Sequence, residues 1–379
     1  MKTLKTLALL FIGALAFVGC EPDGNNDEPS RKGLILVADK TTIYDNGEDC
    51  ATFTAYCDGA TLTQGFQLYI GDEPIEGNTF SSTEQGTFKI WASYGTLISQ
   101  EVSINVVATP PPAPVAPADP QPTKTNFVRR VLLTQFTGTG CGYCPYMINA
   151  LYQVANDATL NSKVVFSAAH LFNDSDPAYL TASATLDNAM GINSFPNLVV
   201  DLNKNTKNVQ PMFVEISNAI NTALSRVAVK GGISVSSKYY ADEEYIVVNA
   251  TVKAKEAGEF RVGAWLLEDG IKANQGNNGI TALPGVDFNT HNNCIRIADS
   301  QATPNVFSGY TLGNIEAGAT ASREFAFKLK PNGTGNKKNW NHDNLRVIVF
   351  ITTKEGDNWY VNNVVAAPKD GSVAFEYAE

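Results

Sequence analysis

The sequence predicts a multidomain chain in which an α/β domain lies between two all-β domains. Short runs rich in β-branched and aromatic residues fill residues 34–108 and return over residues 230–379, with turn signals such as Asp45-Asn46-Gly47 between them. Residues 126–229 instead alternate strand-like and helical patterns. A chain of 379 residues is long enough for two or three such domains.

The first 20 residues have the pattern of a lipoprotein signal peptide. Lys2 and Lys5 precede an apolar run over residues 7–18, which is too short for a stable membrane span. Gly19-Cys20 follows and resembles a bacterial lipoprotein processing site, so we expect Cys20 to become the lipidated first residue of the mature chain. An ordinary signal peptide with an incidental cysteine is the alternative. Both predict export, where disulfides form and persist.

The next segment, residues 21–33, is acidic and rich in turn residues, and we expect it to be a disordered tether. An acidic stretch directly after a lipidated cysteine resembles the surface-export signal of Bacteroidota lipoproteins. The sequence therefore predicts an outer-membrane lipoprotein that faces the periplasm or the cell surface. Retention in the inner leaflet is the alternative.

The charge and the hydropathy of the sequence limit the kinds of partner that we expect. The formal net charge is −10, and Lys and Arg are scattered, whereas a nucleic-acid-binding protein needs a basic stripe to neutralise phosphates. After the signal peptide no apolar stretch reaches about 18 residues, so we expect no transmembrane helix. The membrane contact that remains is the lipid anchor at Cys20.

Residues 34–108 are predicted to form a small β domain. Its strand-like runs are residues 34–38, 51–56, 66–70, 87–92 and 102–106. The pattern resembles the immunoglobulin-like modules of bacterial surface proteins, which implies a spacer or an adhesion platform without chemistry of its own. Residues 109–125 are rich in proline and predict an extended, semi-rigid linker.

The central region, residues 126–229, is predicted to begin with a β-α-β unit and to end with a strand and a closing helix. The expected strands are residues 128–136, 163–169 and 197–201, and the expected helices are residues 145–154, 182–190 and 212–227. Residues 230–379 predict a β-sandwich, and their loop-rich stretch at 270–309 is able to form a lip over a neighbouring domain.

The segment Cys141-Gly142-Tyr143-Cys144-Pro145 carries the chemistry. It lies between a predicted strand and a predicted helix, where free N–H groups and the helix dipole stabilise a thiolate at Cys141. Cys144 lies within the first turn, so the two can close a disulfide. We predict Cys141 as the nucleophile and Cys144 as the resolving thiol. Gly138, Gly140 and Gly142 are expected to leave the sulfur accessible.

A proline about 50 residues later strengthens this interpretation. Ser194-Phe195-Pro196-Asn197 precedes the predicted strand at 197–201, and together with the Cys-x-x-Cys pair it resembles the thioredoxin-like fold. The resemblance implies that Pro196 is cis, packs against the redox pair and contacts the substrate backbone. Two residues depart from the family pattern: Gln135 stands where a buried acid is usual, and Phe195 is bulkier than the usual small residue.

Other interpretations of the cysteines stay open. Cys141 and Cys144 can instead form a static structural disulfide. With His291 and Cys294 they can also supply a Cys₃His zinc set, although the two pairs lie in different predicted domains. We expect neither a resident metal nor a cofactor.

The remaining candidate residues receive modest roles. His170 lies at the end of a predicted strand. A histidine at such a position is more often packed and hydrogen-bonded for structural reasons than placed at the entrance of a redox site. Asp174 and Asp176 are interpreted as loop and cap residues. Cys50 and Cys57 stand at opposite ends of one strand-like run, too far apart to bond, so they and Cys294 are expected to be free thiols.

Three features occur together in residues 126–379. They are Thr134–Gly138 leading into Cys-x-x-Cys-Pro, the α/β middle, and a His-Asn-x-x-x-Arg segment from His291 to Arg296. This combination is similar to the outer-membrane-protein-28-related lipoproteins of Bacteroidota, with the N-terminal module as an addition. The resemblance implies an outer-membrane lipoprotein but assigns no role to His291 or Arg296.

These observations predict an envelope-anchored thiol–disulfide oxidoreductase. Its partners would be the thiols or disulfides of exported proteins. The alternative is a non-catalytic surface adhesion or assembly lipoprotein that uses the α/β domain as a scaffold.

Overall fold

The computed structural model describes residues 33–300 and 307–379. The chain divides into two compact units, with the boundary between Thr109 and Pro110. The predicted signal peptide, Cys20 and the tether up to residue 32 lie outside the described residues. The described chain is mostly β-sheet and has three α-helices. None of these helices has the length and apolar character needed to cross a membrane.

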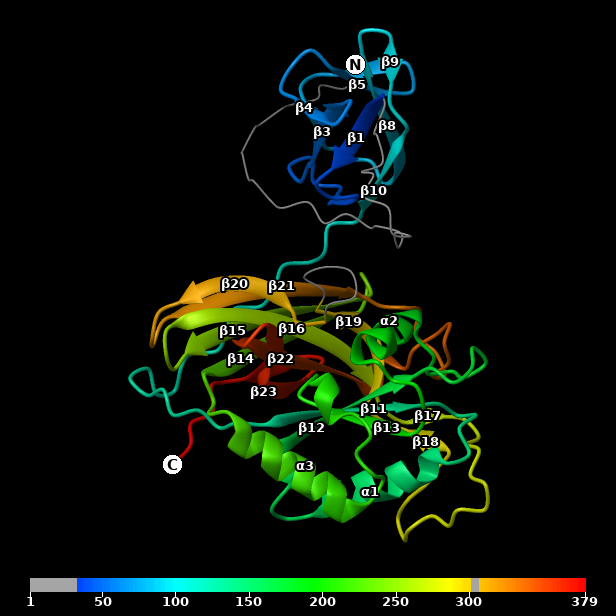
Figure 1. Ribbon diagram of the computed structural model, residues 1–379, viewed down its shortest axis with the longest axis vertical. Coiled ribbons are helices and arrows are strands. Elements are labelled where there is room, and N and C mark those ends of the chain that lie inside the picture. The colour runs from blue at the N-terminus through cyan, green and yellow to red at the C-terminus, as the bar shows by residue number, and fades with distance from the viewer. Residues whose placement is uncertain (1–32, 301–306) are drawn as a thin grey trace, which may run out of the picture. The chain divides into compact units, whose positions relative to one another are not determined.

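The first unit consists of two packed sheets (Figure 1). Their strands are β1 (Leu34–Ala38), β2 (Thr42–Tyr44), β3 (Ala51–Cys57), β4 (Ala60–Leu62), β5 (Gln67–Ile70), β6 (Glu73–Ile75), β7 (Thr79–Phe80), β8 (Gly86–Tyr94), β9 (Leu97–Ile98) and β10 (Val102–Val107). Buried and partly exposed residues alternate along β3, as expected of a sheet with one face on a core that contains Phe53 and Ile90. Cys50 and Cys57 are both free and half-buried.

The second unit contains an eight-stranded sheet in the order β13-β11-β12-β19-β16-β22-β23, with β20 also on β16. These strands are β11 (Val131–Thr137), β12 (Val164–His170), β13 (Asn197–Val200), β16 (Gly258–Glu268), β19 (Cys294–Asp299), β20 (Tyr310–Ile315), β22 (Leu345–Glu355) and β23 (Asn358–Pro368). A four-stranded sheet in the order β21-β15-β14-β24 packs on it: β21 (Thr320–Lys328), β15 (Tyr245–Ala254), β14 (Gly231–Tyr240) and β24 (Gly371–Val373).

One pairing joins the regions that the sequence analysis treats as separate domains. Strand β19 runs parallel to β12, with Ala168 opposite Cys294, and antiparallel to β16. Residues 126–229 and 230–379 therefore share a sheet and lie in one compact unit.

The three helices cover the β13-β11-β12 part of this sheet. Helices α1 (Cys144–Asn156) and α3 (Phe213–Arg226) pack on one face, where Leu133 and Val131 meet Met147, Val154 and Ile216. Helix α2 (Thr181–Met190) packs on the other face, in a core that includes Leu132, Phe136, Trp265 and Phe350. Strand β11 is buried along its whole length because both of its faces are covered. The helix positions agree with the sequence prediction to within two residues.

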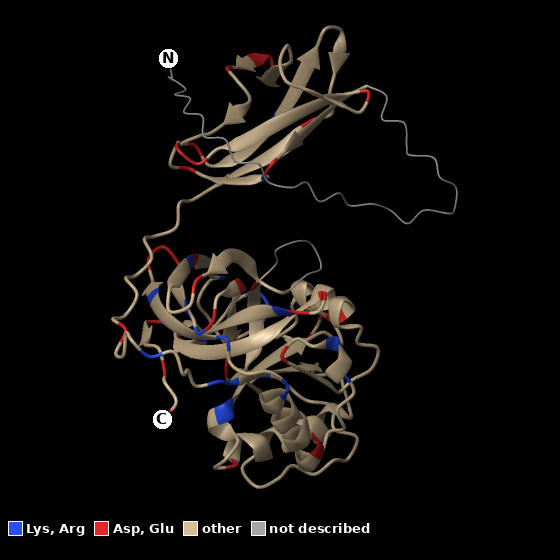
Figure 2. Cartoon of the chain, turned by 60° about the vertical axis from the view of Figure 1, so that its left-hand side comes forward, with Lys and Arg blue, Asp and Glu red and all other residues tan. Residues whose placement is uncertain are grey.

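The proline-rich segment does not run free as the predicted spacer. The carbonyl of Pro112 accepts a hydrogen bond from the Tyr240 hydroxyl at 2.7 Å, and that of Pro114 accepts from Asn249 at 3.2 Å. Lys253, which is buried, pairs with Asp119 at 2.8 Å. Residues 112–122 therefore lie along β14 and β15. In this unit Lys and Arg positions are dispersed among Asp and Glu positions (Figure 2).

Candidate redox site

The Cys-x-x-Cys segment lies where β11 passes into α1. Strand β11 ends at Thr137, and α1 begins at Cys144. Cys141 and Cys144 are joined by a disulfide with a Cα–Cα distance of 5.4 Å. Pro145 lies in the first turn of the helix, where its missing N–H leaves no hydrogen bond unmade. Residues 138–143, called the cysteine loop below, thus place Cys141 just before the positive end of the helix dipole.

Pro196 lies near the same end of β11. The Phe195–Pro196 peptide bond is cis. Strand β13 starts at the next residue, Asn197, which pairs with Phe136 on β11. The register brings Pro196 to the carboxyl end of β11, from which the cysteine loop leaves. The catalytic roles of Cys141, Cys144 and Pro196 stay predictions.

The disulfide is covered. Cys141 is 3% exposed and Cys144 is fully buried. The covering segment is residues 273–289, called the cover loop below, between β17 (Ile271–Lys272) and β18 (Thr290–His291). The Gln275 side-chain nitrogen donates to the Cys141 carbonyl at 2.9 Å, and the Gly276 N–H donates to the Thr139 carbonyl at 2.8 Å. The loop-rich stretch noted in the sequence supplies this lip.

The expectation that glycines expose the sulfur is wrong. A Cβ at Gly140 would lie 2.6 Å from the Phe172 ring, and one at Gly142 would lie 2.3 Å from the Asn278 side chain. A side chain at either position would therefore collide with its neighbour. The glycines let Phe172 and the cover loop pack directly on the cysteine loop, so they close the site instead of opening it.

Aromatic side chains nevertheless face solvent around the cysteine loop. Tyr143 is 61% exposed, Tyr146 is 50% exposed and Phe172 is 53% exposed. The Phe172 ring also meets Phe195 edge to face, with centroids 6.2 Å apart. This grouping gives the surroundings of the disulfide an apolar surface.

Asp176 links the cysteine loop to a buried histidine. Its Oδ2 accepts hydrogen bonds from the Thr139 N–H and from His170 Nδ1, each at 2.8 Å, and its Oδ1 accepts from the Ala178 N–H at 2.8 Å. Burial by itself raises the pKa of Asp176, but the hydrogen bond and charge of His170 outweigh it and hold that pKa at about 2. Asp176 is therefore a buried carboxylate at neutral pH.

His170 also contacts Cys294. Its Nε2 lies 3.5 Å from the Cys294 sulfur, and both side chains are buried. Burial lowers the pKa of His170, but Cys294 and Asp176 together raise it to about 10. Cys294, His170 and Asp176 thus form a buried thiol–imidazole–carboxylate series. The sequence analysis missed it, because it interpreted each residue separately and Cys294 lies more than a hundred positions from the other two.

The alternative zinc set is not assembled. Cys141 and Cys144 bond to each other, whereas Cys294 contacts His170. Within residues 33–300 and 307–379, no group of three or more His, Cys, Asp and Glu side chains is arranged to hold a metal ion.

His291 and Arg296 support the Asp176 segment. The His291 ring packs edge-on against His170, with centroids 5.2 Å apart, and burial lowers its pKa to about 4. Arg296 is buried, pairs with Glu268 at 2.6 Å and donates to the Pro177 carbonyl at 2.8 Å. Arg296 thus holds the loop that carries Asp176, and His291 packs against the histidine that binds Asp176.

A family model and a solved structure are each similar to part of this chain. The family model "Outer membrane protein Omp28" matches residues 183–370, a span that begins within α2, ends just after β23 and crosses the predicted boundary at residue 229. No curated protein sequence matches significantly. Among solved structures, HBP35 of Porphyromonas gingivalis is similar, with a TM-score of 0.51 and 18% identity over 65% of this chain and 76% of that chain. At this identity the likeness concerns the fold alone.

Proposed function

We propose that this chain is a thiol–disulfide oxidoreductase that acts on exported polypeptides through Cys141 and Cys144. The observation that carries the proposal is the bonded pair at the junction of β11 and α1, beside the loop with Pro196. Parallel β12, antiparallel β13 and the helices on both faces support a thioredoxin-like assignment of residues 126–229. The two-sheet packing of the first unit supports an immunoglobulin-like module.

The chemistry starts from the reduced pair. The Cys141 thiolate attacks a substrate disulfide, forms a mixed disulfide and releases one substrate thiolate, which takes up a proton. Cys144 then loses its proton and attacks the Cys141 sulfur. This step re-forms the Cys141–Cys144 bond and releases the second substrate thiol, so two electrons pass to the substrate. The reverse sequence oxidises a substrate dithiol.

Access requires movement of the cover loop, because only 3% of Cys141 is exposed. Tyr143, Tyr146 and Phe172 then offer an apolar surface to an unfolded substrate segment. The Omp28 match supports a place at the outer membrane. In this proposal a lipid on Cys20 anchors the protein, which faces the periplasm or the cell surface.

The test is insulin reduction by the purified protein in dithiothreitol, with Cys141→Ser and Cys144→Ser as variants. We expect Cys141→Ser to lose the activity, and Cys144→Ser to accumulate a mixed disulfide that non-reducing electrophoresis detects. Activity of Cys141→Ser equal to that of the unaltered protein would refute the proposal.

A non-catalytic surface adhesion or assembly lipoprotein is the second candidate. The burial of both cysteines favours it, because inert structural cysteines are usually buried. Equilibration in glutathione or dithiothreitol buffers followed by thiol trapping separates the two. A potential below about −300 mV is typical of structural disulfides and would favour this candidate.

A further inference from the structure

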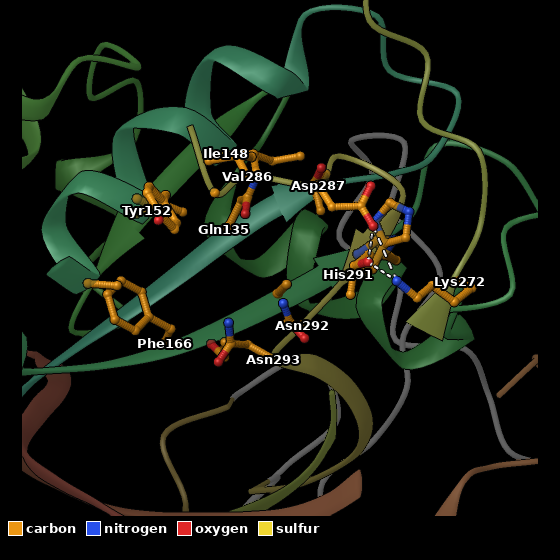
Figure 3. Close-up of a pocket in the computed structure, with 18 residues that line it drawn as sticks. Gln135, Ile148, Tyr152, Phe166, Lys272, Val286, Asp287, His291, Asn292 and Asn293 are labelled. Atoms are coloured by element: carbon orange, nitrogen blue, oxygen red, sulfur yellow. Dashed lines mark hydrogen bonds and ion pairs between the residues drawn. The ribbon is translucent and has the colours of Figure 1, made fainter. Parts of the chain in front are cut away.

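A cavity lies between α1, the sheet and the cover loop (Figure 3). Its volume is about 500 Å³, within the range of small-molecule sites. One wall is a face of α1 with Ile148, Leu151, Tyr152 and Ala155, at the spacing that places side chains in one row. Cys141 and Cys144 do not line it. The cavity is therefore distinct from the disulfide.

The apolar lining is incompletely packed. Ile148, Leu151, Tyr152 and Phe166 are only partly buried, although α1, β12 and the cover loop surround the space between them. The Tyr152 hydroxyl lies so close to Gly285 that a Cβ there would be 2.4 Å away, which brings the cover loop against the helix at this end. The walls are thus in place around a space large enough for a planar apolar group.

Gln135 supplies the polar element. It lines the cavity from β11 and is 7% exposed, yet its side-chain nitrogen has no hydrogen-bond partner among the described residues. A buried donor without a partner destabilises the folded chain, because nothing replaces the hydrogen bond that it made to water. An acceptor that enters the cavity would remove this cost.

The charges around the cavity are balanced. Lys272 and Asp287 at the rim pair with each other at 3.2 Å, and both are exposed. The charge of His170 is compensated by Asp176. Burial lowers the pKa of His291 to about 4, so this side chain is neutral at pH 7. No single charge is left to select an anion or a cation.

We propose that this cavity is a binding site for an uncharged small molecule that carries a planar apolar group and an amide. The apolar group packs between Tyr152 and Phe166. The amide carbonyl accepts the free hydrogen bond of Gln135. The site goes beyond disulfide exchange and does not depend on it.

The experiment titrates the full chain with N-acetyl-phenylalaninamide, which has a ring and amides, and with toluene, which has a ring and no hydrogen-bonding group. Calorimetry and saturation-transfer NMR report binding. We expect the amide to bind about tenfold more tightly, the effect of roughly one buried hydrogen bond. Gln135→Leu abolishes this preference and leaves toluene binding unchanged.

A second variant tests the place of binding without altering the buried glutamine. Ala155→Trp introduces a large side chain at the exposed rim of the cavity and weakens both probes, whereas Gln153→Trp, exposed on the same helix away from the cavity, weakens neither. Cys141→Ser binds both probes normally. Absence of amide binding, or amide binding that survives both Gln135→Leu and Ala155→Trp, overturns the proposal.

Discussion

The carboxylate of Asp176 lies 2.8 Å from the backbone nitrogen of Thr139, two residues before Cys141. The same oxygen accepts from His170, whose other ring nitrogen contacts Cys294. One carboxylate therefore connects the cysteine loop to a histidine on β12 and, through it, to β19. The geometry of the cysteine loop depends on a residue in another loop.

Asp176→Asn tests this dependence. Asparagine has a similar shape but removes the negative charge beside His170, so an uncompensated buried imidazolium is left. We expect the free energy of unfolding to fall by about 3 kcal/mol, as for other broken buried ion pairs. Urea unfolding measures the change. Asp174→Asn is the matched control, because Asp174 is exposed and close in sequence, and an equal loss in both variants would contradict the assignment.

The Arg296–Glu268 pair allows a double-mutant cycle. Both side chains are buried, so Arg296→Met leaves Glu268 without its counter-charge and should cost about 3–5 kcal/mol. Glu268→Gln keeps an acceptor for the Asn341 N–H. We expect the double variant to be less destabilised than the sum of the singles in denaturant unfolding. Additive losses would mean that the two side chains do not stabilise each other.

His291 predicts a pH dependence of stability. Its folded pKa of about 4 lies below the ordinary value of 6.5, so the unfolded chain binds more protons between these pH values. The contribution of His291 to the free energy of unfolding is therefore fully present above pH 6.5. It falls as the pH drops towards 4, by up to about 3 kcal/mol. His291→Gln keeps an N–H for the Ala273 carbonyl and should flatten this part of the profile. An unchanged slope would assign the dependence to other groups.

Gln275 predicts the rate at which the disulfide becomes accessible. Its side-chain nitrogen donates to the carbonyls of Cys141 and Gly138, at 2.9 and 3.2 Å. Each bond contributes roughly 1 kcal/mol, so the loss of both in Gln275→Ala should speed reduction of the disulfide by dithiothreitol about 30-fold. Thiol trapping over time measures the rate. Thr281→Ala changes an exposed side chain of the same loop and should react as the unaltered chain does. Equal rates in all three proteins would show that the cover loop does not limit access.

Local patterns predicted the helices and most of their neighbouring strands. The apolar spacing in α1 and α3 and the buried runs of β11 and β12 are set by nearby residues, so their positions can be read from short windows. The position of the Cys-x-x-Cys pair at a helix start follows from the same patterns.

Long-range relations were not predictable in this way. The pairing of Ala168 with Cys294 joins positions far apart, and no local pattern marks it. The contact between His170 and Cys294 depends on that pairing. The glycine prediction failed for a related reason: a missing side chain leaves space, but the chain alone does not say whether solvent or another segment fills it.

Because β12 and β19 pair in one sheet, the cysteine centre depends on strands that lie far along the chain. A fragment that ends at residue 229 would leave the edge of β12 unpaired and would lack the cover loop, Cys294 and Arg296. Excision would therefore yield an aggregation-prone piece instead of an independently folded module. Transfer of the centre to another protein, by engineering or by gene rearrangement, has to carry the whole of residues 110–379.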